Sequence, residues 1–260
     1  LTQDSNGKTP NDEGFDANSI VTFGTLAPTW NRNWITLLYS AGGSLATEDG
    51  MALNLDNDAA RKVLQSIADL MLVHKVAPTA AISASLPGQP QMFKDKQLGM
   101  AIGGAWSYIN FRNEGIDVGV APLPMFDKPM STAWGSAYML SSQSKNPQEA
   151  FDFLSDFIDP NVNPSQLTFM QPNMLDLYTE EKLAQWMMND DFYNEDFRTT
   201  IPKLITKVAI AGENVKLKDF GPIVDQTISP ILDNFWLGTM TLDEAIAECY
   251  TKTEGMFRGF

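Results

Sequence analysis

QLGMAIGGAWSYINF, residues 97–111, combines a short apolar run, a glycine pair and a tryptophan. An apolar run from Leu98 to Ile102 stops at the pair Gly103–Gly104, and Trp106 follows almost at once. Residues without side chains at the end of a short buried strand let another group approach the backbone. The pattern predicts a strand over 98–102, with the indole of Trp106 at its mouth as a flat amphipathic wall. A strand, a turn and a core tryptophan would give the same pattern, so the rest of the chain has to decide.

Short apolar runs and helical periodicity alternate along the chain. The apolar runs predict buried strands at residues 20–23, 98–102, 118–121 and 138–140. Helical spacing of apolar residues predicts helices within residues 57–78, 145–160, 219–236 and 241–257. Pro230 should kink or interrupt the third of these, and Thr241 and Glu244 have capping-box spacing at the start of the last. Strands alternating with helices indicate an α/β fold, and the proline-rich segment Ala121–Pro129 predicts a stiff crossing between substructures.

Composition excludes several classes of protein. The net charge is −14, with 32 acidic and 18 basic residues, which disfavours binding to nucleic acid or to an anionic membrane surface. No apolar run approaches the ~18 residues of a membrane span. Cys249 is the only cysteine and His74 the only histidine. A disulfide framework and a histidine-rich zinc site are therefore excluded, and a nucleophile–histidine triad is disfavoured.

The first residues have the outline of a calcium loop. Counted from Asp4, Asn6 stands at the third position and Asp12 at the ninth, but Lys8 occupies the fifth. Because an ammonium group in a ligand position repels a cation, we interpret the segment as a turn. The sequence predicts no metal site and no cofactor.

A second acidic cluster lies in NDDFYNEDF, residues 189–197. Two carboxylates could support glycoside hydrolysis, but carboxylates adjacent in sequence rarely face one bond from opposite sides, so a solvated helix end or loop is the better interpretation. The cluster consists of Asp190, Asp191, Glu195 and Asp196. The motifs of serine hydrolases, phosphate-binding loops and dinucleotide-binding loops are incomplete or absent, so we predict a protein that is not an enzyme.

Four tryptophans, Trp30, Trp34, Trp106 and Trp134, lie at the ends of apolar elements. A single tryptophan is more often a core residue. Several at element ends are typical of a sugar-binding cleft, where indole stacks on the apolar face of a pyranose and amides bind its hydroxyl groups. Asn31, Asn33 and Asn173 are candidate polar partners.

Five segments, taken in order, carry a family resemblance: WNRNWITLLYSAGGSLATEDG, LDNDAARKVLQSIADLMLVHKVAP, MFKDKQLGMAIGGAWSYINF, IDVGVAPLPMF and SSQSKNPQEAFDFLSDFI. The chain resembles the extracellular solute-binding proteins of ABC importers, in the branch similar to maltose-binding protein. The resemblance implies an α/β periplasmic-binding-protein-like (type II) fold of two lobes joined by a hinge. We expect one nearly complete lobe, the C-terminal-type ligand-binding lobe, at 1–122 and 161–260. Residues 123–160 would be a hinge crossing and a remnant of the N-terminal-type lobe.

The resemblance also implies what lies outside these residues. Family chains begin with a signal peptide or a lipoprotein cysteine and then most of the first lobe. The 260 residues, which start at Leu1, are therefore expected to represent the remaining two-thirds or so.

The same resemblance implies a ligand site. Trp106 matches the tryptophan of the family's Gly-x-Trp loop, Trp30 falls at a ligand-contact position, and Trp134 matches a cleft-facing position. The predicted ligand-binding residues are Trp30, Asn31, Trp34, Gly103, Gly104, Trp106, Trp134 and Asn173.

The implied function is capture of a sugar or oligosaccharide and its delivery to the permease subunits of an ABC importer. We expect a monomer in the extracellular or periplasmic space, associated with the cell envelope and attached to the membrane only through a lipid anchor outside this chain. Three alternatives stay open: a non-sugar solute such as a polyamine or peptide, a glycoside-acting enzyme that uses the acidic cluster, and a chain that serves adhesion or signalling.

Overall fold

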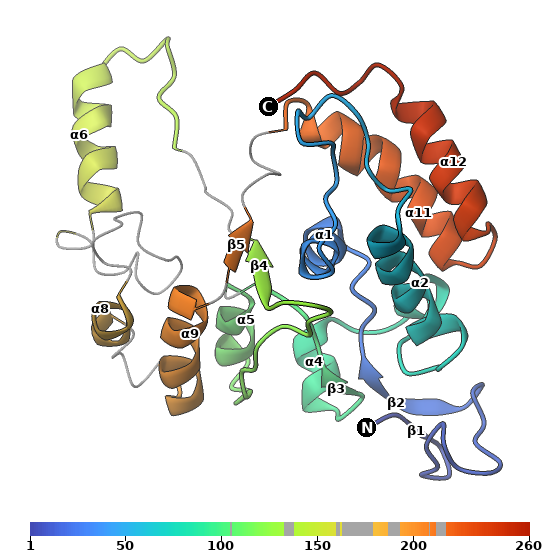
Figure 1. The fold of residues 1–260 in the computed structure, drawn as a ribbon. Coiled ribbons are helices and arrows are strands. Elements are labelled where there is room, and N and C mark those ends of the chain that lie inside the picture. The colour runs from blue at the N-terminus through green and yellow to red at the C-terminus, as the bar shows by residue number, and fades with distance from the viewer. Residues whose placement is uncertain are drawn as a thin grey trace. The chain divides into compact units, whose positions relative to one another are not determined.

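The computed structural model divides into two units, each described by itself (Figure 1). Unit 1 comprises Leu1–Gly103, Leu123–Ala133 and Ala209–Phe260, and unit 2 comprises Gly104–Pro122 and Trp134–Val208. The structure describes residues 1–104, 106–132, 138–159, 162, 179–186, 193–207, 209–211 and 217–260. The boundaries of these units differ from those predicted for the two lobes. The lobe boundaries therefore stay a prediction.

Unit 1 contains a sheet of three strands in the order β1-β2-β3. These are β1 (Gln3–Asp4), β2 (Ile20–Thr25) and β3 (Leu98–Met100). β1 is antiparallel to β2, whereas β2 runs parallel to β3 with Phe23 opposite Leu98. The strands predicted at 20–23 and 98–102 are therefore confirmed, although β3 ends at Met100.

Helices α1 (Asn31–Ser40), α2 (Asp58–Leu72), α11 (Ser229–Trp236) and α12 (Leu242–Thr253) surround the core of unit 1 (Figure 1). Two short helices, α3 (Ala80–Ser83) and α4 (Gln89–Lys94), precede β3. The predicted periodicity of α2 is confirmed, because Val63, Leu64, Ile67 and Met71 are buried. Asn57 caps α2 by accepting a hydrogen bond from the Ala60 N–H, and the Thr241–Glu244 capping box at α12 is present as predicted.

A π-helix, η2 (Gly221–Ile228), leads directly into α11. Pro230 was predicted to kink or interrupt this segment. The helical path instead continues, and the hydrogen-bonding pattern changes from π to α at Ser229, one residue before the proline. Pro230 thus lies in the first turn of α11, and because it has no N–H group it donates no α-helical bond to the carbonyl of Gln226 four residues earlier.

A second sheet in unit 1 joins β4 (Met130–Thr132) in parallel to β5 (Ala209–Ala211). The chain enters unit 1 between Pro122 and Leu123, inside the proline-rich segment. Ser40 at the end of α1 holds the residues that follow: its Oγ donates to the Lys128 carbonyl at 2.6 Å and accepts from the Phe126 N–H at 3.0 Å. α1 is thereby tied to the segment that leads into β4.

Unit 2 contains α5 (Ser107–Asn113), α6 (Pro147–Ile158), α8 (Glu180–Trp186) and α9 (Glu195–Lys207). The helix predicted over Pro147–Ile158 is confirmed, but it buries none of its side chains. The strands predicted at 118–121 and 138–140 are wrong, because neither segment forms a strand in the described part of the chain. Val118 and Val120 pack against the aromatic cluster of Tyr108, Tyr193 and Phe197, so burial in this cluster replaces pairing in a sheet. No helix in the described part of the chain is long and apolar enough to cross a membrane.

Candidate functional site: a polar and aromatic cluster at the start of α1

Trp30 stands at the N-terminus of α1 with its side chain 49% exposed. Its backbone is extended (φ −63°, ψ 136°), and its carbonyl accepts the N–H groups of Asn33 and Trp34, which closes the first turn. The side chain does not cap the helix. A large, exposed indole therefore lies at the end of the helix where backbone N–H groups point outward and the dipole is positive.

Asn31 connects α1 to the π-helix η2. Its side chain is only 4% exposed, and its Nδ2 donates to the Asp225 carboxylate. Its Oδ1 is buried and has no hydrogen-bond partner within the described residues. Because a buried acceptor without a partner is costly, Oδ1 is a ready acceptor for a hydroxyl or amide donor from a ligand or water.

Arg32 lies over two aromatic rings. Its guanidinium carbon is 5.8 Å from the centroid of the Trp30 ring and 5.6 Å from that of Phe220, the residue before η2. Partial burial lowers the pKa of the guanidinium, and the nearby Asp225 carboxylate opposes that shift. Since arginine stays protonated in proteins, the cluster holds one cation and one anion beside the exposed indole.

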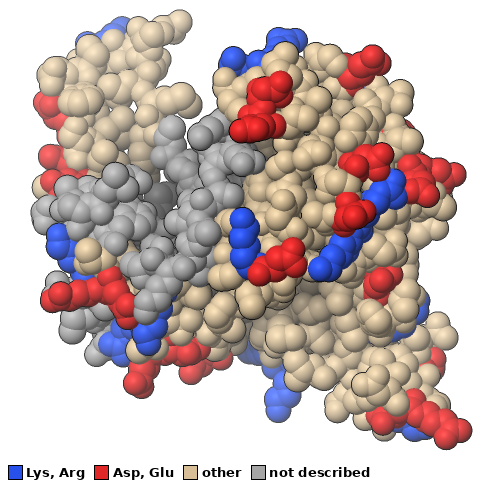
Figure 2. Space-filling view, viewed as in Figure 1, with Lys and Arg blue, Asp and Glu red and all other residues tan. Residues whose placement is uncertain are grey.

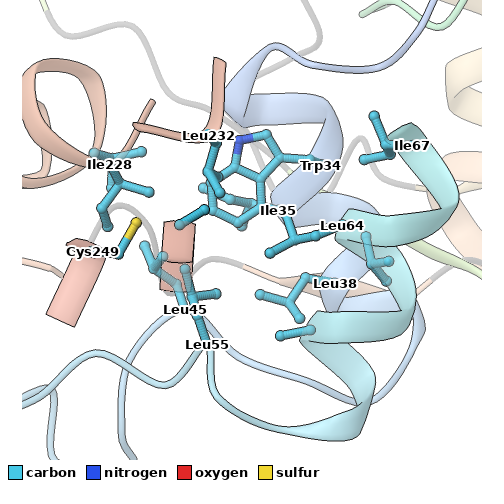
Figure 3. Close-up of a cluster of buried hydrophobic side chains, with 14 of the residues drawn as sticks. Trp34, Ile35, Leu38, Leu45, Leu55, Leu64, Ile67, Ile228, Leu232 and Cys249 are labelled. Carbon is cyan, nitrogen blue, oxygen red and sulfur yellow. The ribbon is translucent and has the colours of Figure 1, made fainter. Parts of the chain in front are cut away.

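Trp34 has a different place from Trp30, although only one helical turn separates them. Its side chain is completely buried in the main core cluster of unit 1, with Leu38, Leu64 and Leu232 (Figure 3). A side chain without exposed surface cannot stack on a solute in this structure. Its burial therefore indicates a packing role for Trp34.

The glycine pair of the opening sequence lies where the chain passes from one unit to the other. The first segment of unit 1 ends at Gly103, and the first segment of unit 2 begins at Gly104. A Cβ atom on Gly104 would overlap the indole of Trp106, which packs against this glycine. Trp106 is nevertheless 49% exposed. Gly104 thus makes room for the ring of Trp106 itself, and Trp106 remains a candidate platform in unit 2.

Trp134 and Asn173 lie outside the described residues, as do Asp190 and Asp191 of the acidic cluster. The other two acidic residues of the cluster, Glu195 and Asp196, are the first two residues of α9. The Asp196 carboxylate accepts the backbone N–H of Val120, so it holds a loop of unit 2.

The calcium-like turn is held by the chain itself. Asp4 is 1% exposed, and its carboxylate accepts the backbone N–H groups of Asn6, Lys8 and Asp16 at 2.8, 2.9 and 3.0 Å. The Lys8 ammonium donates to the Glu13 carbonyl at 2.9 Å. A cation from the chain therefore lies within the loop, and the described residues contain no group of three or more potential ligands for a metal ion.

Charges on the rest of unit 1 are mixed. Figure 2 shows Lys and Arg side chains beside Asp and Glu side chains on the face it draws. Arg61 contacts Asp56 at 2.7 Å and Asp243 at 2.6 Å, and Lys62 lies 3.8 Å from Asp127. Such exposed pairs contribute little to stability, and they give no basic patch of the kind that nucleic acid requires on this face.

The sequence profile described as bacterial extracellular solute-binding protein matches residues 5–160, more than half of the chain. The chain belongs to this family. Solved structures support the same fold. An ABC substrate-binding protein from Listeria monocytogenes, in complex with cycloalternan, is 18% identical with a TM-score of 0.74, and the match covers 99% of this chain and 66% of that one. A solute-binding protein from Thermotoga lettingae, bound with α-D-tagatose, is 23% identical with a TM-score of 0.61, covering 89% and 57%.

Maltose-bound MalE3 of T. maritima is 17% identical, with a TM-score of 0.68 and coverage of 93% and 62%. No match was found among curated protein sequences. This member of the solute-binding family thus spans between 57% and 66% of the length of these structures. The predicted α/β, periplasmic-binding-protein-like fold is confirmed, and so is the family resemblance.

Sequence reasoning identified Trp30 and Asn31 but missed three of their neighbours in the cluster. Arg32 directly follows Asn31 in the sequence, and the tryptophans two residues before and after it could have suggested a cation–π contact. Phe220 and Asp225 carry no local signal, because their relation to α1 arises only when η2 packs against it.

Proposed function

We propose that the protein is the substrate-binding subunit of an ABC importer and that it captures a sugar or oligosaccharide outside the cytoplasm. The observation that carries this proposal is the half-exposed Trp30 at the start of α1, with the buried Asn31 and the Asp225 carboxylate beside it. An indole face with adjacent acceptors and donors suits a pyranose, whose ring is apolar on its faces and polar at its edge. Delivery to permease subunits and attachment at the cell envelope belong to the same proposal.

Family membership and similar structures with bound sugars support this reading. Trp106, Gly103 and Gly104 are proposed as further ligand contacts, as are Trp134 and Asn173. Of the acidic cluster on which the enzyme alternative depends, Asp196 accepts the backbone N–H of Val120 and so has a structural partner. A polyamine or peptide ligand is the second candidate to be tested.

The test is to titrate the protein with maltotriose, D-tagatose, spermidine and a tripeptide. Binding is followed by tryptophan fluorescence and by isothermal titration calorimetry. We expect a saturable response to one sugar that is lost in Trp30→Ala and weakened in Trp106→Ala. Phe153→Ala is the control, because Phe153 is also an exposed aromatic residue (64%) but lies on α6. A response to no sugar, or one unchanged in both tryptophan variants, contradicts the proposal.

A further inference from the structure

The guanidinium of Arg32 is positioned to restrain the indole of Trp30. Arg32 follows Trp30 by two residues on α1, and its guanidinium carbon lies over both the Trp30 ring and the Phe220 ring, at 5.8 and 5.6 Å from their centroids. Phe220 comes from a distant part of the sequence. A planar cation that contacts two rings from separate segments holds them in place more firmly than either contact alone would.

The same guanidinium also sets the charge beside the indole. Asp225 accepts a hydrogen bond from the side chain of Asn31, the neutral residue before Arg32, so its carboxylate lies beside the first turn of α1 that also carries Arg32. The Arg32 and Asp225 charges cancel, so the surroundings of Trp30 carry no net charge from this pair. A site of this kind offers donors and acceptors to hydroxyl groups without favouring an ionised solute.

We propose that Arg32 is a positioning residue that fixes the Trp30 platform and, with Asp225, makes the site selective for an uncharged polyhydroxy solute over a polyamine. This inference rests on the proposed function in taking Trp30 as a ligand contact. A ligand stacks on the exposed part of the indole, which is 49% accessible. Loss of the Arg32 charge leaves Asp225 uncompensated, which turns the same site toward cations.

The decisive variant is Arg32→Met, which keeps an unbranched apolar stem and removes the charge and the planar donor group. Arg32→Lys restores the charge without the planar contact. Arg61→Met is the matched control, because Arg61 is an exposed arginine of α2 paired with Asp56 and Asp243. Each variant is titrated with maltotriose, D-tagatose and spermidine at about 0.15 M salt, which screens distant surface charges.

We expect Arg32→Met to weaken the sugar response about 2- to 30-fold, the range of a cation–π contact expressed as affinity. It should also gain spermidine binding, and the additional change Asp225→Asn should abolish that gain. Arg32→Lys should retain the native preference for an uncharged solute while binding sugar less tightly. Equal sugar binding in Arg32→Met and native protein, or no gain of spermidine binding, overturns the inference.

A readout without ligand separates this inference from the proposed function. Acrylamide quenching of Trp30, isolated by subtracting the signal of Trp30→Phe, should increase in Arg32→Met and stay unchanged in Arg61→Met. If the native protein binds none of the sugars, the proposed function fails, and the quenching still decides whether Arg32 holds the indole. Unchanged quenching refutes the positioning role in either case.

Discussion

Replacement of Trp34 distinguishes a core tryptophan from a ligand platform. The side chain is completely buried among the apolar residues of α1, α2 and α11 (Figure 3). Removing a buried indole costs about 3–5 kcal/mol of unfolding free energy. That is a large part of the ~5–15 kcal/mol by which a domain is stable. Trp34→Ala should therefore unfold at a much lower urea concentration than the native protein.

The more informative change is Trp34→Phe. The indole N–H of Trp34 is buried and has no hydrogen-bond partner within the described residues, and a buried donor left unpaired costs about 1–3 kcal/mol. Phenylalanine removes this donor, which offsets the loss of ring volume, so we expect a net cost of only ~0–2 kcal/mol. Trp236→Phe is the matched control. Trp236 is 2% exposed in the same cluster and donates to the Leu64 carbonyl at 3.5 Å, a long bond whose loss adds slightly to the cost.

The assay is urea unfolding followed by far-ultraviolet circular dichroism, combined with the sugar titration. The expected order of destabilisation is Trp34→Ala, then Trp236→Phe, then Trp34→Phe. The folded Trp34→Phe protein should keep the sugar response that Trp30→Ala loses. A cost below about 1 kcal/mol for Trp34→Ala, or loss of the sugar response in a stable Trp34→Phe protein, would refute the core assignment.

Three further predictions concern other parts of the molecule. Burial raises the pKa of the Cys249 thiol to about 12, so at pH 8 a disulfide reagent should label the protein only after unfolding, and rapid labelling of folded protein would contradict this. Asn194→Ala removes the side chain that caps α9 by accepting the Phe197 N–H, together with its hydrogen bonds to the Asp117 carboxylate and the Val118 carbonyl. Hydrogen exchange in unit 2 should therefore show that the free energy of opening falls by about 1–2 kcal/mol. Unchanged protection would exclude this capping role. The backbone N–H of Asp16 lowers the pKa of Asp4 below its ordinary 3.8, so this carboxylate stabilises the fold above that value, and the benefit is lost as the pH falls. Melting temperatures measured from pH 6 to pH 3 should therefore fall less steeply in Asp4→Asn, and parallel profiles would count against it.

Elements with local signals were predictable from the sequence. The helix Pro147–Ile158 has a proline at its first position and apolar residues at helical spacing, and its bounds agree with the structure. The Thr241–Glu244 box is equally local, since both residues belong to one turn. Propensity and capping are properties of neighbouring residues, so they need no knowledge of the rest of the fold.

Strands were less predictable, because a strand also requires a partner. The runs 98–102 and 118–121 look alike in the sequence, yet only the first pairs with another strand, at β2. Val118 and Val120 pack on aromatic residues of unit 2. An apolar run therefore predicts burial more securely than it predicts a strand.

The residues of the candidate site also differ in how far the sequence could predict them. Trp30 and Asn31 stand together in the sequence and could be proposed from their chemistry, whereas the burial of Trp34 depends on α2 and α11. The sequence alone cannot distinguish these two tryptophans, because a spacing of four residues is also the spacing of neighbours on one helix face. Exposure separates them: half of the Trp30 side chain is accessible and none of Trp34 is.

The acidic partner of the site depends on the helix change before Pro230. A proline has no N–H to donate to the carbonyl four residues earlier, so an α-helical pattern through this point would leave one bond unmade. The π-helical pattern of η2 ends at Ile228, and within it the Thr227 hydroxyl donates to the Pro222 carbonyl at 2.8 Å. Asp225 lies in this wider segment, and its hydrogen bond with Asn31 is made from there. The proline that suggests a break in the sequence therefore lies directly after the π-helical segment that carries Asp225 and its hydrogen bond to Asn31.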